Sequence, residues 1–346
     1  MAYSAILKPS TLMNTKLYTG NGGTNAQTGV GFQPDWVWLK QRSGSASSNK
    51  LYDSVRGTTK YIASNNDGAE ATDSNGLTAF GTDGFTVGSS AGTNANNETY
   101  VGWNWKAGTS FSNSAGANGA SLASTGSVNT TSGFSIISFA GASAVSTVAH
   151  GLGAAPKMII FKNRSDADAW GVYHESIGSN AALYLNETAG SDGTLWNNTA
   201  PTSSVFTVQN NSAVNGSGNN IIAYCFAEKQ GYSKFSSYEG NGNVNGTFIY
   251  TGFKPAFVMV KPVDASDNWV MFDNKRDTFN SSTSPFNFYA NTAGVETTDT
   301  GQLDFTAQGF KIRNGGNTVN RTSTFIYMAF AENPFVASNY NAATAR

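Results

Sequence analysis

Charged side chains are scarce in this chain. Lys, Arg, Asp and Glu make up 12% of its 346 residues, and the formal net charge is −1. Proteins that bind nucleic-acid phosphates or anionic membranes carry basic clusters, so the composition predicts neither partner. No apolar run approaches the roughly 20 residues that cross a bilayer, and residues 1–9 lack the regions of a signal peptide. We therefore expect that the protein is synthesised in a cytoplasm and does not insert into a membrane.

Cysteine and histidine are rarer still. The one cysteine, Cys225, excludes an internal disulfide, and its apolar neighbours at 221–226 predict a buried side chain. Nucleophilic catalysis needs a base beside the nucleophile, and the two histidines, His150 and His174, stand apart in the sequence. We therefore expect neither a His-dependent catalytic site nor a transition-metal site.

Glycine and aromatic residues are abundant, with 38 glycines and 12% Phe, Trp and Tyr. Disordered chains are poor in aromatic residues. No segment shows sustained helical periodicity, and short aromatic runs alternate with Gly, Asn and Asp turns. The sequence predicts an all-β fold of antiparallel sandwiches.

One pattern occurs three times along the chain. In each copy a Gly stands three residues before a Pro and a Lys six residues after it, at 31–40, 153–162 and 252–261. An aromatic strand closes each copy. We interpret the chain as three tandem, jelly-roll-like β-sandwich units. The expected divisions are an N-terminal arm at 1–15, unit 1 at 16–106, a flexible Gly/Ser/Asn-rich linker at 107–132, unit 2 at 133–230, unit 3 at 231–336 and a C-terminal tail at 337–346.

The strand after each proline is apolar without alternation. Residues 36–39, 158–161 and 257–260 are all apolar, whereas a sandwich strand with one wet face alternates. Both faces of these strands therefore need cover. We expect the outer face of each sheet to pack on a neighbouring unit or on another subunit.

Four motifs carry a resemblance to a known family. They are Tyr-Thr-Gly-Asn-Gly at 18–22, Gly-Phe-x-Pro-x-x-Val at 31–37, Asp-Ser-x-Arg-Gly at 53–57 and Ala-Phe-Ala-Glu-Asn-Pro-Phe at 329–335. Over about residues 16–336 the chain resembles repeat-containing tail-fibre-like or virion structural proteins of tailed phages of aquatic bacteria. The resemblance implies a virion-surface protein released by lysis, with other virion proteins as partners, and transfers no catalytic residue.

Carboxylates suggest two further hypotheses. A glycan depolymerase needs two carboxylates facing each other across a groove, but the sequence shows no converging pair among Asp53, Glu70, Asp166, Asp168, Glu175, Asp273 and Glu296. Asp53 and Asp273 occupy equivalent places, which favours a structural role in a turn or in pairs with Arg56 and Arg276. We expect no cofactor, and calcium is the one candidate to set against that expectation. Its candidate ligands lie in two oxygen-rich loops that ordinary Asx turns also explain: Asp67, Glu70, Asp166 and Asp168.

The seven tryptophans fall into two groups. Those at 36, 38, 103 and 105 lie in apolar strands and are expected in the core of unit 1. Trp170, Trp196 and Trp269 lie near polar loops. They are candidate platforms for a sugar ring, with core or loop packing as the alternative.

Two non-enzymatic functions follow from these patterns. The first is a tail-fibre-like adhesin, a homotrimer that contacts a host-surface glycan or receptor through polar loops. The second is a decoration protein that reinforces the capsid or tail and has no receptor. A glycan depolymerase is the third alternative.

Overall fold

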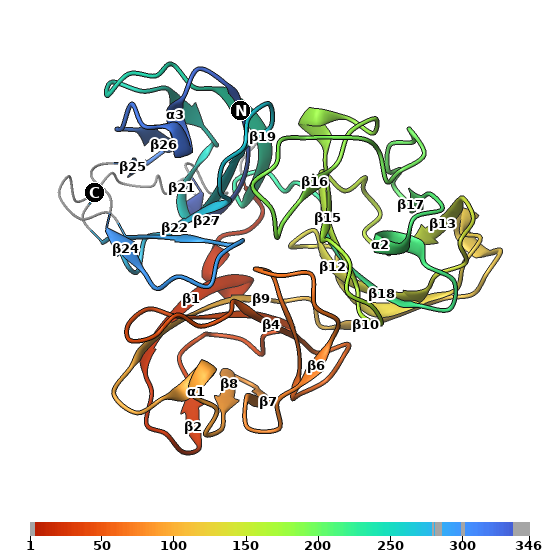
Figure 1. Ribbon diagram of the computed structural model, residues 1–346, viewed down its shortest axis with the longest axis horizontal. Helices are drawn as coiled ribbons and strands as arrows, with labels where there is room; N and C mark the ends of the chain where they lie inside the picture. The colour runs from red at the N-terminus through yellow and green to blue at the C-terminus, as the bar shows by residue number, and fades with distance from the viewer. Residues whose placement is uncertain (1–3, 279, 281–285, 299–301, 335–346) are drawn as a thin grey trace.

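The computed structural model describes residues 4–278, 280, 286–298 and 302–334, so the expected tail at 337–346 lies outside the described residues. The chain forms three lobes around a common centre (Figure 1). Nearly all regular structure is antiparallel β-sheet. The predicted all-β fold is confirmed.

Each lobe contains one large sheet. The first sheet has the order β1 (Met13–Thr19), β9 (Thr99–Trp105), β3 (Trp36–Gln41), β4 (Lys50–Asp53), β5 (Lys60–Ala63) and β6 (Ala71–Thr72). The second has the order β10 (Thr109–Asn113), β11 (Ser124–Asn129), β12 (Phe134–Ala140), β18 (Asn220–Phe226), β14 (Met158–Asn163), β15 (Gly171–His174) and β16 (Leu183–Tyr184). The third has the order β19 (Ser233–Glu239), β27 (Thr324–Pro334), β21 (Phe253–Pro262), β22 (Val270–Asp273), β23 (Phe286–Tyr289) and β24 (Thr297–Thr298).

The three sheets share one run of strands. In each, the strand that closes the lobe (β9, β18 or β27) lies between β1, β12 or β19 on one side and β3, β14 or β21, the strand that carries the apolar run after the repeated proline, on the other. This shared order lets positions be compared between lobes. The division of the chain into three tandem repeats is our interpretation of it.

A small sheet faces each large one. The small sheets are β2 (Asn25–Gln27), β8 (Gly84–Val87) and β7 (Leu77–Gly81); β13 (Ser146–Ala149) and β17 (Val205–Val208); and β20 (Phe248–Tyr250), β26 (Gly309–Ile312) and β25 (Leu303–Thr306). In the first lobe Val37 and Leu39 of the large sheet share an apolar core with Phe85 of the small sheet. Equivalent cores fill the other two lobes. Each lobe is thus an asymmetric β-sandwich.

Short helices stabilise the tight loops of the lobes. They are η1 (Pro9–Thr11), α1 (Ala91–Asn94), η2 (Ala117–Gly119), η3 (Glu175–Ile177), α2 (Ser212–Asn215) and α3 (Asn317–Asn320). Each α-helix ends in a buried asparagine whose Oδ1 accepts a backbone N–H from a strand-end loop, as Asn94 does from Asn21 at 3.0 Å. Gly20 precedes Asn21, and a Cβ there would lie 2.1 Å from the Ala95 carbonyl oxygen. The glycine of the Tyr-Thr-Gly-Asn-Gly motif is therefore a requirement of close backbone approach.

The strands after the prolines are buried on both faces, as their composition predicts. In β3, Trp36 and Trp38 point to the molecular centre while Val37 and Leu39 point into the sandwich. The same alternation holds in β14 and β21. The predicted packing of the outer sheet faces is confirmed, because the three faces meet each other.

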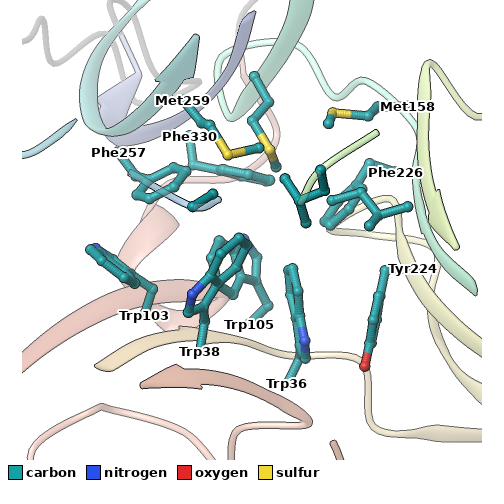
Figure 2. Packing of buried hydrophobic residues seen from close by; sticks show 14 of the residues in the cluster. Trp36, Trp38, Trp103, Trp105, Met158, Tyr224, Phe226, Phe257, Met259 and Phe330 are labelled. Atoms are coloured by element: carbon teal, nitrogen blue, oxygen red, sulfur yellow. The ribbon is translucent and has the colours of Figure 1, made fainter. Parts of the chain in front are cut away.

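Aromatic rings dominate this central core (Figure 2). Trp36 of the first lobe stacks on Tyr224 of the second with 4.5 Å between ring centroids. Trp105 lies 5.8 Å from Phe330 of the third lobe, and Phe226 of the second lobe lies 6.0 Å from the same ring. All three lobes therefore share one apolar core, which belongs to none of them alone.

Two expected boundaries differ in the structure. Residues 107–132, predicted to be a flexible linker, contain β10 and β11, which extend the second sheet to seven strands. Their small polar residues suit a sheet edge, where half of each strand faces water. The expected N-terminal arm also ends early, because Met13 is buried and already pairs with Trp105 in β1.

Candidate functional site

The junctions between lobes repeat one arrangement of polar side chains. The last residue of β4, β15 and β22 is Asp53, His174 and Asp273. Each is fully buried and contacts the closing strand of another lobe. The Trp103 indole N–H donates to Asp273 Oδ2 at 3.0 Å, and the Tyr224 hydroxyl donates to Asp53 Oδ2 at 2.7 Å. These three positions form the candidate site.

Both aspartates also hold a turn and an arginine within their own lobe. Asp53 Oδ1 accepts the backbone N–H of Arg56 at 2.8 Å, while its Oδ2 lies 2.5 Å from Arg56 Nε. Asp273 makes the same two contacts with Arg276, at 3.0 and 2.5 Å. The predicted turn and the predicted Asp–Arg pairs are confirmed. The carboxylates are thereby fully occupied.

A glutamate completes each aspartate–arginine pair. Glu70 Oε2 lies 3.4 Å from Arg56 Nη1 and accepts from Arg164 Nε of the second lobe at 2.8 Å. In the first–third junction, Glu296 bridges Arg276 at 3.1 Å and Arg42 of the first lobe at 2.8 Å. Both of these junctions therefore contain a partly buried Arg–Glu–Arg bridge in addition to the buried Asp–Arg pair.

The second–third junction has the same backbone contacts but neutral side chains. Val263 stands where Arg42 and Arg164 stand, and its carbonyl accepts the N–H of Ser191 at 2.6 Å. His174 replaces the aspartate, and its Nε2 lies 3.2 Å from the Tyr327 carbonyl oxygen of the third lobe. At the two positions compared this junction carries uncharged side chains, and we call it the neutral junction although the buried Lys261 also lies in it.

Burial holds His174 in its neutral form. Its Nδ1 accepts the N–H of Ser176 at 3.2 Å, which leaves the proton on Nε2 facing the carbonyl. Desolvation lowers the pKa of His174 to about 4 and that of His150 also to about 4. His150 lies in the second sandwich, where its Nε2 faces the Thr202 carbonyl oxygen at 3.1 Å. Neither histidine lies beside a nucleophile in the contacts described, and both serve as hydrogen-bonding groups.

The repeated lysines are all buried, and two of them bond to a carbonyl of another lobe. Lys40 donates to the Ala293 carbonyl of the third lobe at 2.8 Å, and Lys261 donates to the Thr188 carbonyl of the second lobe at 3.1 Å. Lys162 donates to the Asp166 carbonyl at 3.2 Å. Burial lowers the pKa of all three to about 8. Sequence reasoning found the spacing of these lysines but not their role.

The three tryptophans considered as sugar platforms are all buried. Trp170 of the second lobe donates its indole N–H to the Ala63 carbonyl of the first at 3.0 Å, and Trp269 of the third donates to the Tyr184 carbonyl of the second at 3.0 Å. Trp196 packs against Phe161 with 5.0 Å between ring centroids. None offers an open face to a ligand, so the alternative interpretation, internal packing, describes their positions.

At the first–third junction, two residues of the first lobe together replace the single tryptophan found at the other junctions. Asn49 stands where the other lobes have Trp170 and Trp269, and its Nδ2 donates to the Thr292 carbonyl of the third lobe at 2.8 Å. The indole is supplied from the neighbouring strand by Trp38, whose N–H donates to Asn49 Oδ1 at 3.1 Å. One large ring therefore fills each junction from one of two adjacent positions.

The calcium candidates are engaged in protein contacts. Glu70 lies between two arginines, Asp166 accepts from Asn219 at 2.6 Å, and Asp168 accepts from Asn163 and Ser212, each at 2.8 Å. The Asp67 carbonyl accepts the N–H of Asp168 at 3.0 Å. Within the residues that the structure describes, no group of three or more His, Cys, Asp and Glu side chains is placed to hold a metal ion.

Three pockets on the described surface show what kinds of side chain are grouped there. One of about 470 Å³ lies between the second and third lobes and is lined by amide and hydroxyl side chains with one carboxylate, Glu187. A second, of about 430 Å³, contains Asp35 as its one carboxylate, and the third, of about 180 Å³, contains none. None of these three pockets presents the paired carboxylates of a two-carboxylate glycosidase.

Fold and junctions together define an all-β protein whose three sandwich lobes close around one core. The chain belongs to the family DUF7483, described as a domain of unknown function, whose model matches residues 8–334. No curated protein matches the chain. In the described part of the chain, no helix is long and apolar enough to span a bilayer.

Proposed function

We propose that this protein is a tail-fibre-like adhesin on the surface of a phage particle, which contacts a host-surface glycan or receptor. The sequence motifs at 18–22, 31–37, 53–57 and 329–335 support the phage particle. The observation that carries the adhesin is the polar pocket between the second and third lobes. Asn186, Asn268 and Asn291 and three hydroxyl residues line it, and amides and hydroxyls are suited to hydrogen bonding with sugar hydroxyls.

Hydrogen bonds within the protein hold the amide side chains of this pocket in place. Asn291 Oδ1 accepts the N–H of Trp269 at 3.0 Å, and its Nδ2 donates to Asn268 Oδ1 at 2.8 Å. Asn186 Oδ1 accepts the N–H of Trp170 at 2.8 Å. The pocket amides are therefore held by the same buried tryptophans that fill the junctions, which reduces the entropy lost when a ligand binds.

A glycan array probed with the full-length protein tests this function. We expect binding to a restricted set of glycans, lost in the pocket variants Glu187→Ala and Ser266→Ala. Ser112→Ala, in the pocket that contains Asp35, is the matched control and should bind as the wild type does. Binding that survives both pocket variants would move the ligand elsewhere, and no glycan or receptor binding would refute the adhesin.

A decoration protein is the second candidate. It is favoured by the shape of the described chain, in which all three lobes close around one centre and none extends as a shaft (Figure 1). Antibody-gold labelling of intact phage particles distinguishes the two functions. Label at the tail tip or on fibres supports the adhesin, whereas label spread over the head or along the tail supports decoration. No label on intact particles would contradict both.

A further inference from the structure

An aromatic pair is exposed at one edge of the third lobe. Phe248 and Tyr250 of β20 are 47% and 56% exposed, while Ile249 between them is 5% exposed and packs into the sandwich core. β20 is an edge strand, because its small sheet has the order β20-β26-β25. Proteins usually protect such edges with charge, proline or a covering segment. We therefore expect that an open edge with two exposed aromatic rings is covered by another polypeptide segment.

The second lobe shows what covers the equivalent edge. There, residues 119–124 run along β13, and Leu122 forms a parallel bridge with Val148. The Ser121 N–H donates to the Thr147 carbonyl at 2.9 Å, and the Thr147 N–H donates to Ser121 Oγ at 2.8 Å. Ser124 Oγ donates to the Ala149 carbonyl at 3.0 Å. An extended segment of the chain thus provides hydrogen-bond partners for the outward backbone groups of β13.

Strand register places Phe248 where Thr147 stands. Val148 pairs with Phe206 in the second lobe, and Ile249 pairs with Phe310 in the third, so the residue before each is equivalent. Successive backbone groups of a strand point to opposite sides. The N–H and C=O of Phe248 therefore face the open edge, as those of Thr147 face residues 119–124. No described strand pairs with that edge of β20.

The aromatic pair is particular to the third lobe. In the first lobe Gln27 pairs with Phe85, so Ala26 and Thr28 take the places of Phe248 and Tyr250. Ala26 is exposed at an edge strand as well, but it offers little side-chain contact. The first lobe therefore provides a natural comparison, with the same backbone edge and without the rings.

We propose that the open edge of β20 binds an extended polypeptide segment of a partner protein by strand addition. The backbone of Phe248 supplies the hydrogen bonds, and the Phe248 and Tyr250 rings contact side chains of the added segment. The partner segment resembles residues 119–124 in chemistry, being uncharged, with small hydroxyl residues flanking an aliphatic one. This inference does not depend on the proposed adhesin function, since it concerns another surface and another class of ligand.

The test uses full-length protein and a labelled synthetic peptide with the sequence of residues 117–129. We expect saturable binding by fluorescence anisotropy and slower hydrogen exchange of the Phe248 amide in the complex. Phe248→Pro removes the outward N–H and leaves the ladder with β26, as proline is tolerated on an edge strand. It should weaken binding at least about tenfold, which corresponds to about 1.4 kcal/mol. Ala26→Pro, the matched change in the first lobe, should leave binding unchanged.

Two further variants separate the rings from the backbone. Phe248→Ala and Tyr250→Ala keep both N–H groups and should weaken binding by a smaller factor than Phe248→Pro. Peptide binding equal in the wild type and Phe248→Pro, or no saturable binding up to roughly 1 mM, would overturn the proposal. A glycan that binds the wild type and is lost in Tyr250→Ala, with no peptide binding, would also overturn it and make the pair a sugar platform.

Discussion

The three junctions at the centre of this protein share one backbone geometry but differ in chemistry. The first–second and first–third junctions each contain a buried Asp–Arg pair and an Arg–Glu–Arg bridge. The second–third junction uses His174, Val263 and Ser191 at the corresponding positions. A buried Asp–Arg pair is therefore not required to bring two lobes together, since the neutral junction achieves the same backbone contact without one.

The comparison shows how much the charged side chains add to the stability of a junction. In all three junctions a backbone N–H of one lobe meets a carbonyl of another: Glu70 to Arg164 at 2.9 Å, Glu296 to Arg42 at 3.2 Å and Ser191 to Val263 at 2.6 Å. Desolvating an ion pair offsets much of its attraction, whereas removing one partner is strongly destabilising. We infer that the charged junctions are not much stronger than the neutral one but tolerate substitution far less.

The largest expected effect comes from leaving a buried arginine without its aspartate. Asp273→Ala leaves the Trp103 indole N–H without its acceptor and leaves Arg276 with Glu296 as its remaining carboxylate, and should lower the free energy of unfolding by about 3–5 kcal/mol. His174→Ala at the same position of the neutral junction loses a hydrogen bond and some packing, and should cost about 1–2 kcal/mol. Urea denaturation of both variants checks the difference. Equal losses would show that charge plays no special part in the junctions.

A second test moves the tryptophan of the first lobe to the position that it has in the other two lobes. Trp38→Ile alone opens a cavity beside Asn49 and should cost about 2–4 kcal/mol. Asn49→Trp alone overpacks the junction and should cost about 1–3 kcal/mol. The double variant places the indole where the second and third lobes have it. Its loss should be at least about 1 kcal/mol smaller than the sum of the single losses, whereas additive losses would refute the exchange of ring positions.

Acid should act on the neutral junction through His174. Its pKa is about 4 when folded against an ordinary value of 6.5, so between these values the unfolded chain binds more protons. The stability it contributes is complete above pH 6.5 and is lost as the pH falls towards 4, by about 3 kcal/mol. Urea denaturation at several pH values should show a flatter slope for His174→Gln. An unchanged slope would mean that other groups govern this window.

The smallest effect is expected from an ion pair at the surface. Lys157 and Glu175 form a salt bridge whose side chains are 33% and 51% exposed. Lys157→Ala should change the free energy of unfolding by less than about 0.5 kcal/mol, because solvent screens the pair. The same denaturation assay provides the reference for the Asp273→Ala loss. A comparable loss at Lys157 would contradict the importance of burial.

Much of the fold, but little of the junction chemistry, was predictable from the sequence. Four consecutive apolar residues at 36–39 correctly indicate a strand covered on both faces, and the Asp53–Arg56 spacing indicates a turn and an ion pair. The contact between Trp103 and Asp273 spans 170 positions, and a single sequence does not say which apolar faces meet. Trp170 and Trp269 suggested sugar platforms because their sequence neighbours are polar. Their indole N–H groups are satisfied by carbonyls of another lobe, which local sequence does not reveal.

The expected linker was misjudged for a different reason. β10 and β11 are built mainly from Ser, Thr, Gly and Asn, with Phe111 as the one large apolar residue of β10 and Val128 as that of β11. An edge strand with polar side chains lacks the apolar alternation by which strands are recognised. The edge strand β10 is held by its ladder with β11, and β11 by its ladder with β12. Pairing of that kind depends on the neighbouring strand as much as on the strand itself.

The shared core has a consequence for how its positions can vary. In a ring of three identical subunits, every substitution at an interface appears three times, so a poor contact is multiplied by the symmetry. Here the three lobes belong to one polypeptide, so the residues of each junction are encoded separately. One junction can therefore carry a histidine where the other two carry an aspartate and its ion pair. The covalent connection allows each junction to change without altering the other two.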